Sequence, residues 1–337
     1  MWKFLFGILF VLGLFCLAGA YKIFYAPNIN AERRIAIKIP TGSTYQEVMN
    51  ILHKHSVLKN EWTFEIVSRW KYLDQNIKPG YYVLTRGMDN RLIVNTLRMG
   101  WQTPVTLVIY NVRTKEEFSG LVGHTLEIDS NKLLAKLNDE TFCKTYERDT
   151  NNILSRFILD NYEFYWNTSL EKFMQKTETA YHRFWDEERM SQANALHLSP
   201  TQIVILASIV EKEVIFDKEL SIVAGVYLNR LRIGMPLQAD PTLVFARRDF
   251  KAQRVNATHR AVDSPYNTYK NRGLPPGPIC LPRKKSIDAV LNAEKHPYLY
   301  FCANPDMSGN SIFSKTLTEQ NKIARQYRKT LDKMNIH

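Results

Sequence analysis

Two glutamates at the end of a very apolar segment are the residues whose type and spacing could do chemistry. The run "LSPTQIVILASIVEKE" is apolar around a whole helix until it reaches Glu211 and Glu213. A helix that is apolar on all sides is buried, so a carboxylate at its end is poorly hydrated. Burial disfavours the charged form and raises the pKa of a carboxyl group. A carboxylic acid that stays protonated near neutral pH is what general acid catalysis requires.

A structural explanation competes with the catalytic one. Either glutamate could pair with a lysine or arginine where the helix emerges from the core. Helical spacing does not choose between the two, because Glu211 lies one turn after Ala207 and Glu213 one turn after Ile209. The residues alone therefore leave the identity of the acid open.

A second chemically suggestive stretch follows the helix. "DSPYNTYKNRGLPPGPICLP" contains five prolines and two glycines and no helical period, so it is expected to be a rigid extended loop. It carries four consecutive residues, Tyr266 to Tyr269, whose aromatic, amide and hydroxyl groups suit the apolar faces and polar edges of a sugar polymer. The alternative is an ordered surface loop whose tyrosines pack on the core.

Other kinds of active site are not indicated. His53 and His55 form an HxH pair at a predicted helix end, and no HExxH motif occurs. The four cysteines contain no CxxC pair, and Ser208 has no GxSxG context. We therefore expect neither a metal nor another cofactor.

The N-terminus predicts a membrane anchor. Residues 4–21 are uncharged, which is about the length needed to cross a bilayer. Lys3 and the terminal amine favour a cytoplasmic N-terminus. The competing interpretation is a cleaved signal peptide ending at "LAGA". In both cases the chain after Pro27 lies outside the cytoplasm, which argues against nucleic acid as the partner of a chain with net charge +12.

The elements that must position these residues suggest an α+β protein in three parts. We predict a transmembrane anchor over 1–27, a small α/β module over 28–103 and a larger mixed α+β catalytic domain over 104–337. The small module reads strand–helix–helix–strand, with a capping box at Thr44 and Glu47, and resembles a lysin motif. In the large domain, Ser199 and Pro200 open the apolar helix, and Asp240 is the predicted N-cap of a short helix.

The chain resembles the endolytic murein transglycosylases, which are single-pass membrane enzymes that cut peptidoglycan strands. The matching stretches are "ASIVEKE", "VYLNRLRIGMPLQADPT", "YNTYKNRGLPPGPI", "PYLYF" and "FSKTLTEQN". The resemblance implies that the acid is the first glutamate of the Ala-Ser-Ile-x-Glu motif, Glu211. The expected substrate-binding residues are Gln238, Asp240, Tyr266, Asn267, Thr268 and Tyr269.

The resemblance also implies the reaction and the partners. The enzyme would cleave the MurNAc–GlcNAc bond of nascent strands, leave 1,6-anhydro-MurNAc ends and limit strand length. Its location would be the bacterial inner membrane, with residues 4–21 in the bilayer, the catalytic domain outside the cytoplasm, and peptidoglycan synthases as partners. The alternative function is a non-catalytic, membrane-anchored scaffold that binds the cell wall and recruits those synthases.

Overall fold

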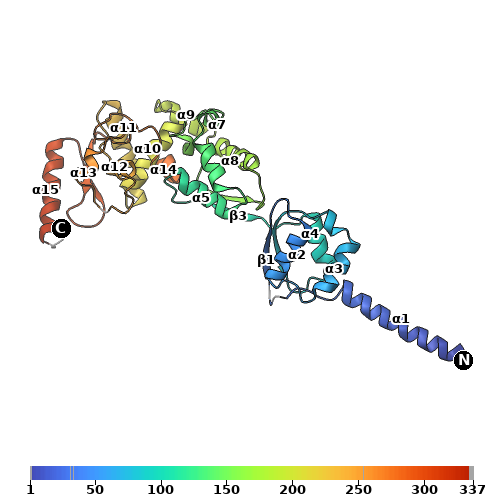
Figure 1. The fold of residues 1–337 in the computed structure, drawn as a ribbon. Coiled ribbons are helices and arrows are strands. Elements are labelled where there is room, and N and C mark those ends of the chain that lie inside the picture. The colour runs from blue at the N-terminus through green and yellow to red at the C-terminus, as the bar shows by residue number, and fades with distance from the viewer. Residues whose placement is uncertain (1, 31, 33, 253, 334–337) are drawn as a thin grey trace. The chain divides into compact units, whose positions relative to one another are not determined.

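The computed structural model describes residues 2–30, 32, 34–252 and 254–333, which fold as two compact units (Figure 1). The first unit holds the chain up to Leu107 together with Val122–Asp129 and Asn161–Leu170, and the second holds the remainder. Helices and short two-stranded sheets are mixed in the chain. The prediction of an α+β fold with an N-terminal apolar helix is therefore confirmed.

Helix α1 (Trp2–Phe24) buries none of its residues. Within the described ranges, it is the one single helix that is long and apolar enough to cross a membrane. Helices α9 (Glu187–Ala195) and α10 (Pro200–Glu213) reach that length only as a pair bent by 79°, and α10 is a core helix of the second unit.

The first unit has the strand–helix–helix–strand order that the sequence predicts. Strands β1 and β2 pair antiparallel, with Ile37 opposite Tyr82, and the capping box of Thr44 and Glu47 opens α2. The pairing of β3 with β4 adds a second small sheet. The bounds are β1 (Arg34–Ile39), α2 (Tyr45–Lys54), α3 (Glu61–Trp70), η1 (Leu73–Gln75), β2 (Gly80–Thr85), α4 (Asn90–Met99), β3 (Val105–Val108) and β4 (Asn161–Phe164).

The second unit is mostly helical around α10, and its one described sheet is the hairpin of β5 and β6. The helices that lead to α10 are α5 (Lys115–Thr125), α6 (Ser130–Leu137), α7 (Glu140–Lys144), η2 (Ile153–Arg156) and α8 (Leu170–Phe184). The elements after α10 are η3 (Asp217–Glu219), α11 (Leu220–Arg232), α12 (Asp240–Arg247), α13 (Ala257–Ala261), α14 (Lys284–Leu291), β5 (Tyr300–Ala303), β6 (Ser311–Ser314) and α15 (Leu317–Lys333).

Local sequence explains where α10 begins and ends. The predicted capping box of Ser199 and Gln202 is present, and Pro200 occupies the first turn, where its missing N–H costs nothing. All eight residues from Ile203 to Val210 are buried, and α10 packs against α11, α12 and α14. Val214 is extended, so the helix stops directly after Glu213.

One predicted cap is wrong. Asp240 was expected to be the N-cap of α12, but Ala239 holds that position and provides no side-chain cap. The Asp240 carboxylate instead accepts a hydrogen bond from the hydroxyl of Tyr269 at 2.5 Å. This tertiary partner replaces the local backbone partner that the sequence suggested.

Candidate active site

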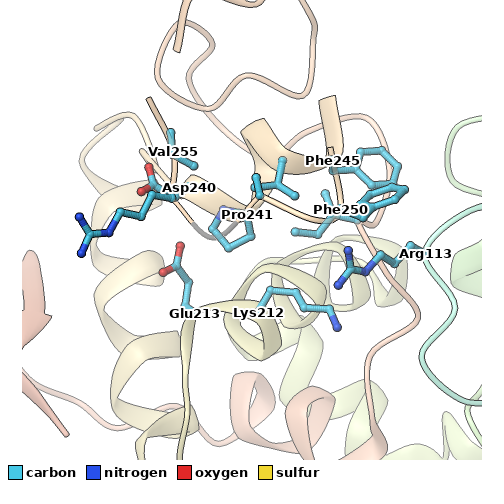
Figure 2. Close-up of a pocket in the computed structure, with 12 residues that line it drawn as sticks. Arg113, Lys212, Glu213, Asp240, Pro241, Phe245, Phe250 and Val255 are labelled. Atoms are coloured by element: carbon cyan, nitrogen blue, oxygen red, sulfur yellow. The ribbon is translucent and has the colours of Figure 1, made fainter. Parts of the chain in front are cut away.

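A pocket of about 480 Å³ lies beside the C-terminal end of α10 and the first turn of α12. This volume is in the range of sites that bind small molecules or one or two sugar units. Its lining residues are Arg113, Lys212, Glu213, Asp240, Pro241, Val244, Phe245, Phe250, Ala252, Arg254, Val255 and Ile279. Figure 2 shows the Glu213 carboxylate pointing into this space, towards Asp240 and Pro241.

Glu213 has the properties of a general acid. Burial raises the pKa of its carboxyl group to about 7, and the neighbouring charge of Asp240 adds to that rise. The Tyr227 hydroxyl donates a hydrogen bond to Oε1 at 2.9 Å and, together with Arg230, opposes the rise. Part of the side chain stays open to the pocket, so its proton can reach a bound molecule.

Asp240 completes an acidic side of the pocket. Burial and the hydrogen bond to Asp240 together raise the pKa of Tyr269 far above its usual value, which keeps this phenol protonated and donating. The donated bond fixes the orientation of the Asp240 carboxylate beside Glu213 (Figure 2).

The other sides of the pocket are basic and aromatic. Arg113, Lys212 and Arg254 contribute cationic groups, and the guanidinium of Arg113 lies 4.8 Å from the centre of the Phe250 ring. None of these three cations forms an ion pair within the described part of the chain. The pocket therefore offers positive charge and an apolar face to a ligand.

The surroundings predicted for Glu211 are wrong. Its carboxylate accepts hydrogen bonds from the backbone N–H of Arg283 at 2.7 Å and the hydroxyl of Ser286 at 2.8 Å. It also pairs with the Arg283 guanidinium at 3.2 Å. Glu211 is not among the pocket-lining residues. The desolvation that motivated its choice is found at Glu213, and the catalytic assignment of Glu211 remains a prediction that the geometry does not favour.

The predicted substrate-binding residues separate into two groups. Asp240 lines the pocket and Tyr269 is bonded to it. Asn267 and Thr268 are buried and organise the loop. The Asn267 amide donates to the backbone carbonyls of Arg260 and Val262.

The remaining loop residues also have structural partners. The Thr268 hydroxyl bonds to Thr242 at 2.9 Å. The ring of Tyr266 packs 4.8 Å from that of Phe245, which is the alternative considered for the loop tyrosines. Gln238 is exposed and does not line the pocket. Its positive φ of 51° and its N–H bond to the Thr268 carbonyl give its backbone a role in the loop.

Sequence reasoning missed several residues of the pocket. Arg113 belongs to a distant segment, and Phe245, Phe250 and Arg254 are in ordinary helical or loop sequence. Among the residues that the structure describes, no group of three or more histidine, cysteine, aspartate or glutamate side chains is arranged to hold a metal.

A membrane-length N-terminal helix, an α+β body and a desolvated carboxyl group facing a polar pocket are the features expected of an acid–base enzyme with an N-terminal hydrophobic segment. The model of the YceG-like family matches residues 37–326 of the chain. The chain belongs to this family.

Relatives of known name and a solved structure agree with this assignment. An endolytic murein transglycosylase of Bacillus subtilis is 31% identical, and the match covers 88% of this chain and 86% of that protein. One from Streptococcus pneumoniae is 28% identical over 82% of this chain and 55% of its own length. A crystal structure of a YceG-like protein from Listeria monocytogenes, 29% identical, covers 87% of this chain and 99% of that chain with a TM-score of 0.58. The prediction that the chain is a lytic transglycosylase is confirmed.

Proposed function

We propose that this protein is an endolytic peptidoglycan lytic transglycosylase in which Glu213 is the catalytic acid. The observation that carries the proposal is a carboxyl group with a pKa of about 7 at the wall of an open pocket. The names of the relatives from B. subtilis and S. pneumoniae supply murein as the substrate class. The cationic side of the pocket suits the carboxylates of the stem peptides, or of lactyl groups from which the peptide has been removed.

The proposed reaction needs one residue for two proton transfers. Protonated Glu213 gives its proton to the glycosidic oxygen between MurNAc and GlcNAc as the bond to the anomeric carbon breaks. The 6-hydroxyl of the same MurNAc then attacks that carbon, and the Glu213 carboxylate removes the hydroxyl proton. The products are a 1,6-anhydro-MurNAc end and a free GlcNAc end. Attack from within the same sugar replaces external water, with the large proximity advantage of an intramolecular step.

Asp240, Tyr227 and Tyr269 would support this cycle without transferring the proton. Asp240 favours the protonated form of Glu213 before cleavage, and the Tyr227 hydroxyl stabilises the carboxylate formed after it. Bound saccharide would displace water from the pocket and strengthen the desolvation of Glu213.

The cellular part of the proposal follows from the chain's organisation. Helix α1 would hold the enzyme in the cell membrane, and the strand–helix–helix–strand module would bind glycan as lysin motifs do. Partnership with peptidoglycan synthases and the limiting of strand length would follow from cutting nascent strands at that membrane.

The decisive experiment compares two conservative variants on purified glycan strands. Glu213→Gln removes the proton donor and is expected to reduce cleavage by about 10²–10⁴-fold. Glu211→Gln keeps an acceptor for Arg283 and Ser286 and is expected to retain cleavage within about tenfold. The proposal is wrong if Glu213→Gln cuts at the parental rate, or if only Glu211→Gln is inactive while remaining folded.

Mass spectrometry of the same digests separates the alternative functions. Anhydro-ended products indicate lytic transglycosylation, ordinary reducing ends indicate hydrolysis, and intact strands indicate the non-catalytic scaffold. We expect anhydro ends with the wild-type chain and intact strands with Glu213→Gln.

A further inference from the structure

The first unit has an exposed aromatic stripe on α3. Trp62, Ile66 and Trp70 are spaced four residues apart and so lie along one side of the helix. Trp62 is 66% exposed and Trp70 is 63% exposed, which is unusual for the largest apolar side chain. The proposed glycosidase chemistry does not use this stripe, because the pocket belongs to the second unit.

Contacts at both ends of α3 tie it to the last turn of α1. At the C-terminal end, the Trp70 ring meets the Phe24 ring edge-on with centroids 5.3 Å apart. At the N-terminal end, the Asn90 amide donates to the carbonyl of Ile23 at 2.8 Å and to the hydroxyl of Thr63 at 3.1 Å. These contacts place the stripe next to the end of α1.

The same junction is held by a buried amide pair. Asn28 donates to Asn90 at 2.6 Å and to the backbone carbonyl of Asn60 at 2.8 Å, and Asn28 and Asn90 are both buried. Satisfied buried polar groups fix one geometry, since breaking them leaves groups without partners. The orientation of α3 at the end of α1 is therefore set by several bonds at once.

This geometry has a consequence if α1 spans the bilayer, which is part of the proposed function. The uncharged residues 4–21 form a helix about 27 Å long, so the hydrocarbon region ends near Tyr21. Phe24 and the Trp70 ring against it then lie at the depth of the lipid head groups. Tryptophan is enriched at that depth because its ring is apolar and its N–H is polar.

The charges around the stripe also fit a lipid surface. Lys71 lies 5.5 Å above the Trp70 ring, and Lys59 and Arg69 are exposed. The acidic neighbours are Glu65, which pairs with Arg69, and Glu61, which contacts the imidazole of His53. They are outnumbered by the three cations Lys59, Arg69 and Lys71. The face is aromatic with basic groups at its margins, which complements anionic phospholipid.

We propose that the aromatic stripe of α3 docks the first unit onto the head-group layer of the membrane that holds α1. The structural basis is the placement of Trp62 and Trp70 on a helix whose C-terminal ring contacts Phe24 and whose first turn is linked to Ile23 through the Asn90 amide. Docking holds the first unit against the lipid surface and removes two exposed indoles from water.

The test is fluorescence quenching of the full chain in vesicles of phosphatidylethanolamine and phosphatidylglycerol whose acyl chains are brominated near the head group. The chain has six tryptophans, so each contribution is obtained by subtracting the signal of a variant. The variants are Trp62→Phe/Trp70→Phe for the stripe, Trp101→Phe for a 54% exposed tryptophan elsewhere on the unit, and Trp2→Phe for the start of α1.

We expect the stripe contribution to be quenched by more than half and that of Trp101 to change little. An unquenched stripe with a quenched Trp2 would overturn docking while leaving the anchor intact. Unquenched Trp2 would overturn the anchor, and docking with it. Quenching of Trp101 equal to that of the stripe would also overturn the proposal, because it would show unspecific contact. If brominated lipid does not quench the stripe, but glycan strands added to unbrominated vesicles do lower its fluorescence, the stripe binds glycan and the docking proposal is wrong.

Discussion

At the residue scale, the raised pKa of Glu213 predicts how activity depends on pH. The acid must be protonated when it meets the glycosidic oxygen, so kcat/KM is expected to fall as pH rises through about 7. Tyr227→Phe removes a hydrogen bond that favours the carboxylate, so the pKa of Glu213 should rise and the alkaline limb should move to higher pH. A pH profile of strand cleavage measures both. A merely structural role of Tyr227 would lower the rate without moving the limb.

The raised pKa of Glu213 also predicts that its ionised carboxylate destabilises the folded protein at alkaline pH. The pKa of Glu213 is about 7 in the folded chain against a model-peptide value of 4.5, so the folded state binds the proton more tightly. Its contribution to stability is complete below about pH 4.5 and is lost as pH rises to about 7. At about 1.4 kcal/mol per pKa unit, Glu213→Gln should stabilise the second unit by about 1–3 kcal/mol at pH 8 and by little at pH 4.5. Denaturant unfolding at the two pH values measures this difference, and equal effects would contradict it.

The sequence predicts a carboxyl group at the end of an apolar helix, but it does not determine which of the two glutamates faces the pocket. The predicted apolar helix that ends in two glutamates is present, and Asp240, one of the predicted binding residues, lines the pocket. Glu211 and Glu213 are only two residues apart, yet one faces α14 and the other faces the pocket. Which side each one faces depends on helices and loops that are distant in sequence. The polar side chains of Asn267 and Thr268 form hydrogen bonds within the protein that hold the loop. Composition alone cannot distinguish such residues from residues that bind a ligand.

At the scale of elements, Glu211 joins α10 to the start of α14. Arg283 is the N-cap of α14 and has no side-chain cap of its own, so the Glu211 carboxylate supplies negative charge at that helix end. Arg283 also pairs with Asp217 at 2.8 Å, which extends the network to the segment that leads into α11. Helix α10 thus ends in two carboxylates with different surroundings, one at the pocket and one at the start of α14.

This junction predicts a graded effect of substitution. Glu211→Ala leaves the Arg283 N–H and the Ser286 hydroxyl without their acceptor and is expected to cost about 2–4 kcal/mol. Glu211→Gln retains that acceptor and loses only an ion pair with a partly exposed guanidinium, so it is expected to cost about 1 kcal/mol or less. Urea unfolding of the two variants tests the order. If both cost the same, the carboxylate is not acting as an acceptor at this helix end.

At the scale of the whole molecule, the two units are interleaved in sequence, which local patterns could not predict. Glu127 joins the first unit because its carboxylate accepts the hydroxyl and N–H of Thr41 at 2.6 Å and its N–H donates to the Trp166 carbonyl at 2.8 Å. The partners in the first pair are 86 residues apart. The periodicities that give helices and strands carry no information on such pairs.

The orientation of α1 in the membrane needs a direct test, because positive charges flank both ends of its apolar segment. Lys3 and the terminal amine precede the apolar segment, but Lys22, Arg33 and Arg34 follow it, so the positive-inside rule does not settle the orientation. The proposed function requires the catalytic domain to lie outside the cytoplasm, where peptidoglycan is found. We therefore predict that Tyr110→Cys, at a 67% exposed position, reacts with an impermeant maleimide on intact spheroplasts. Trp2→Cys should react only after permeabilisation. The native Cys143 and Cys280 are buried, but Cys16 is exposed on α1 and Cys302 is partly exposed. Both variants are therefore made in a Cys16→Ser/Cys302→Ser background, and that background without an added cysteine is the control. The opposite labelling pattern would place the pocket in the cytoplasm, where it could not reach cell wall.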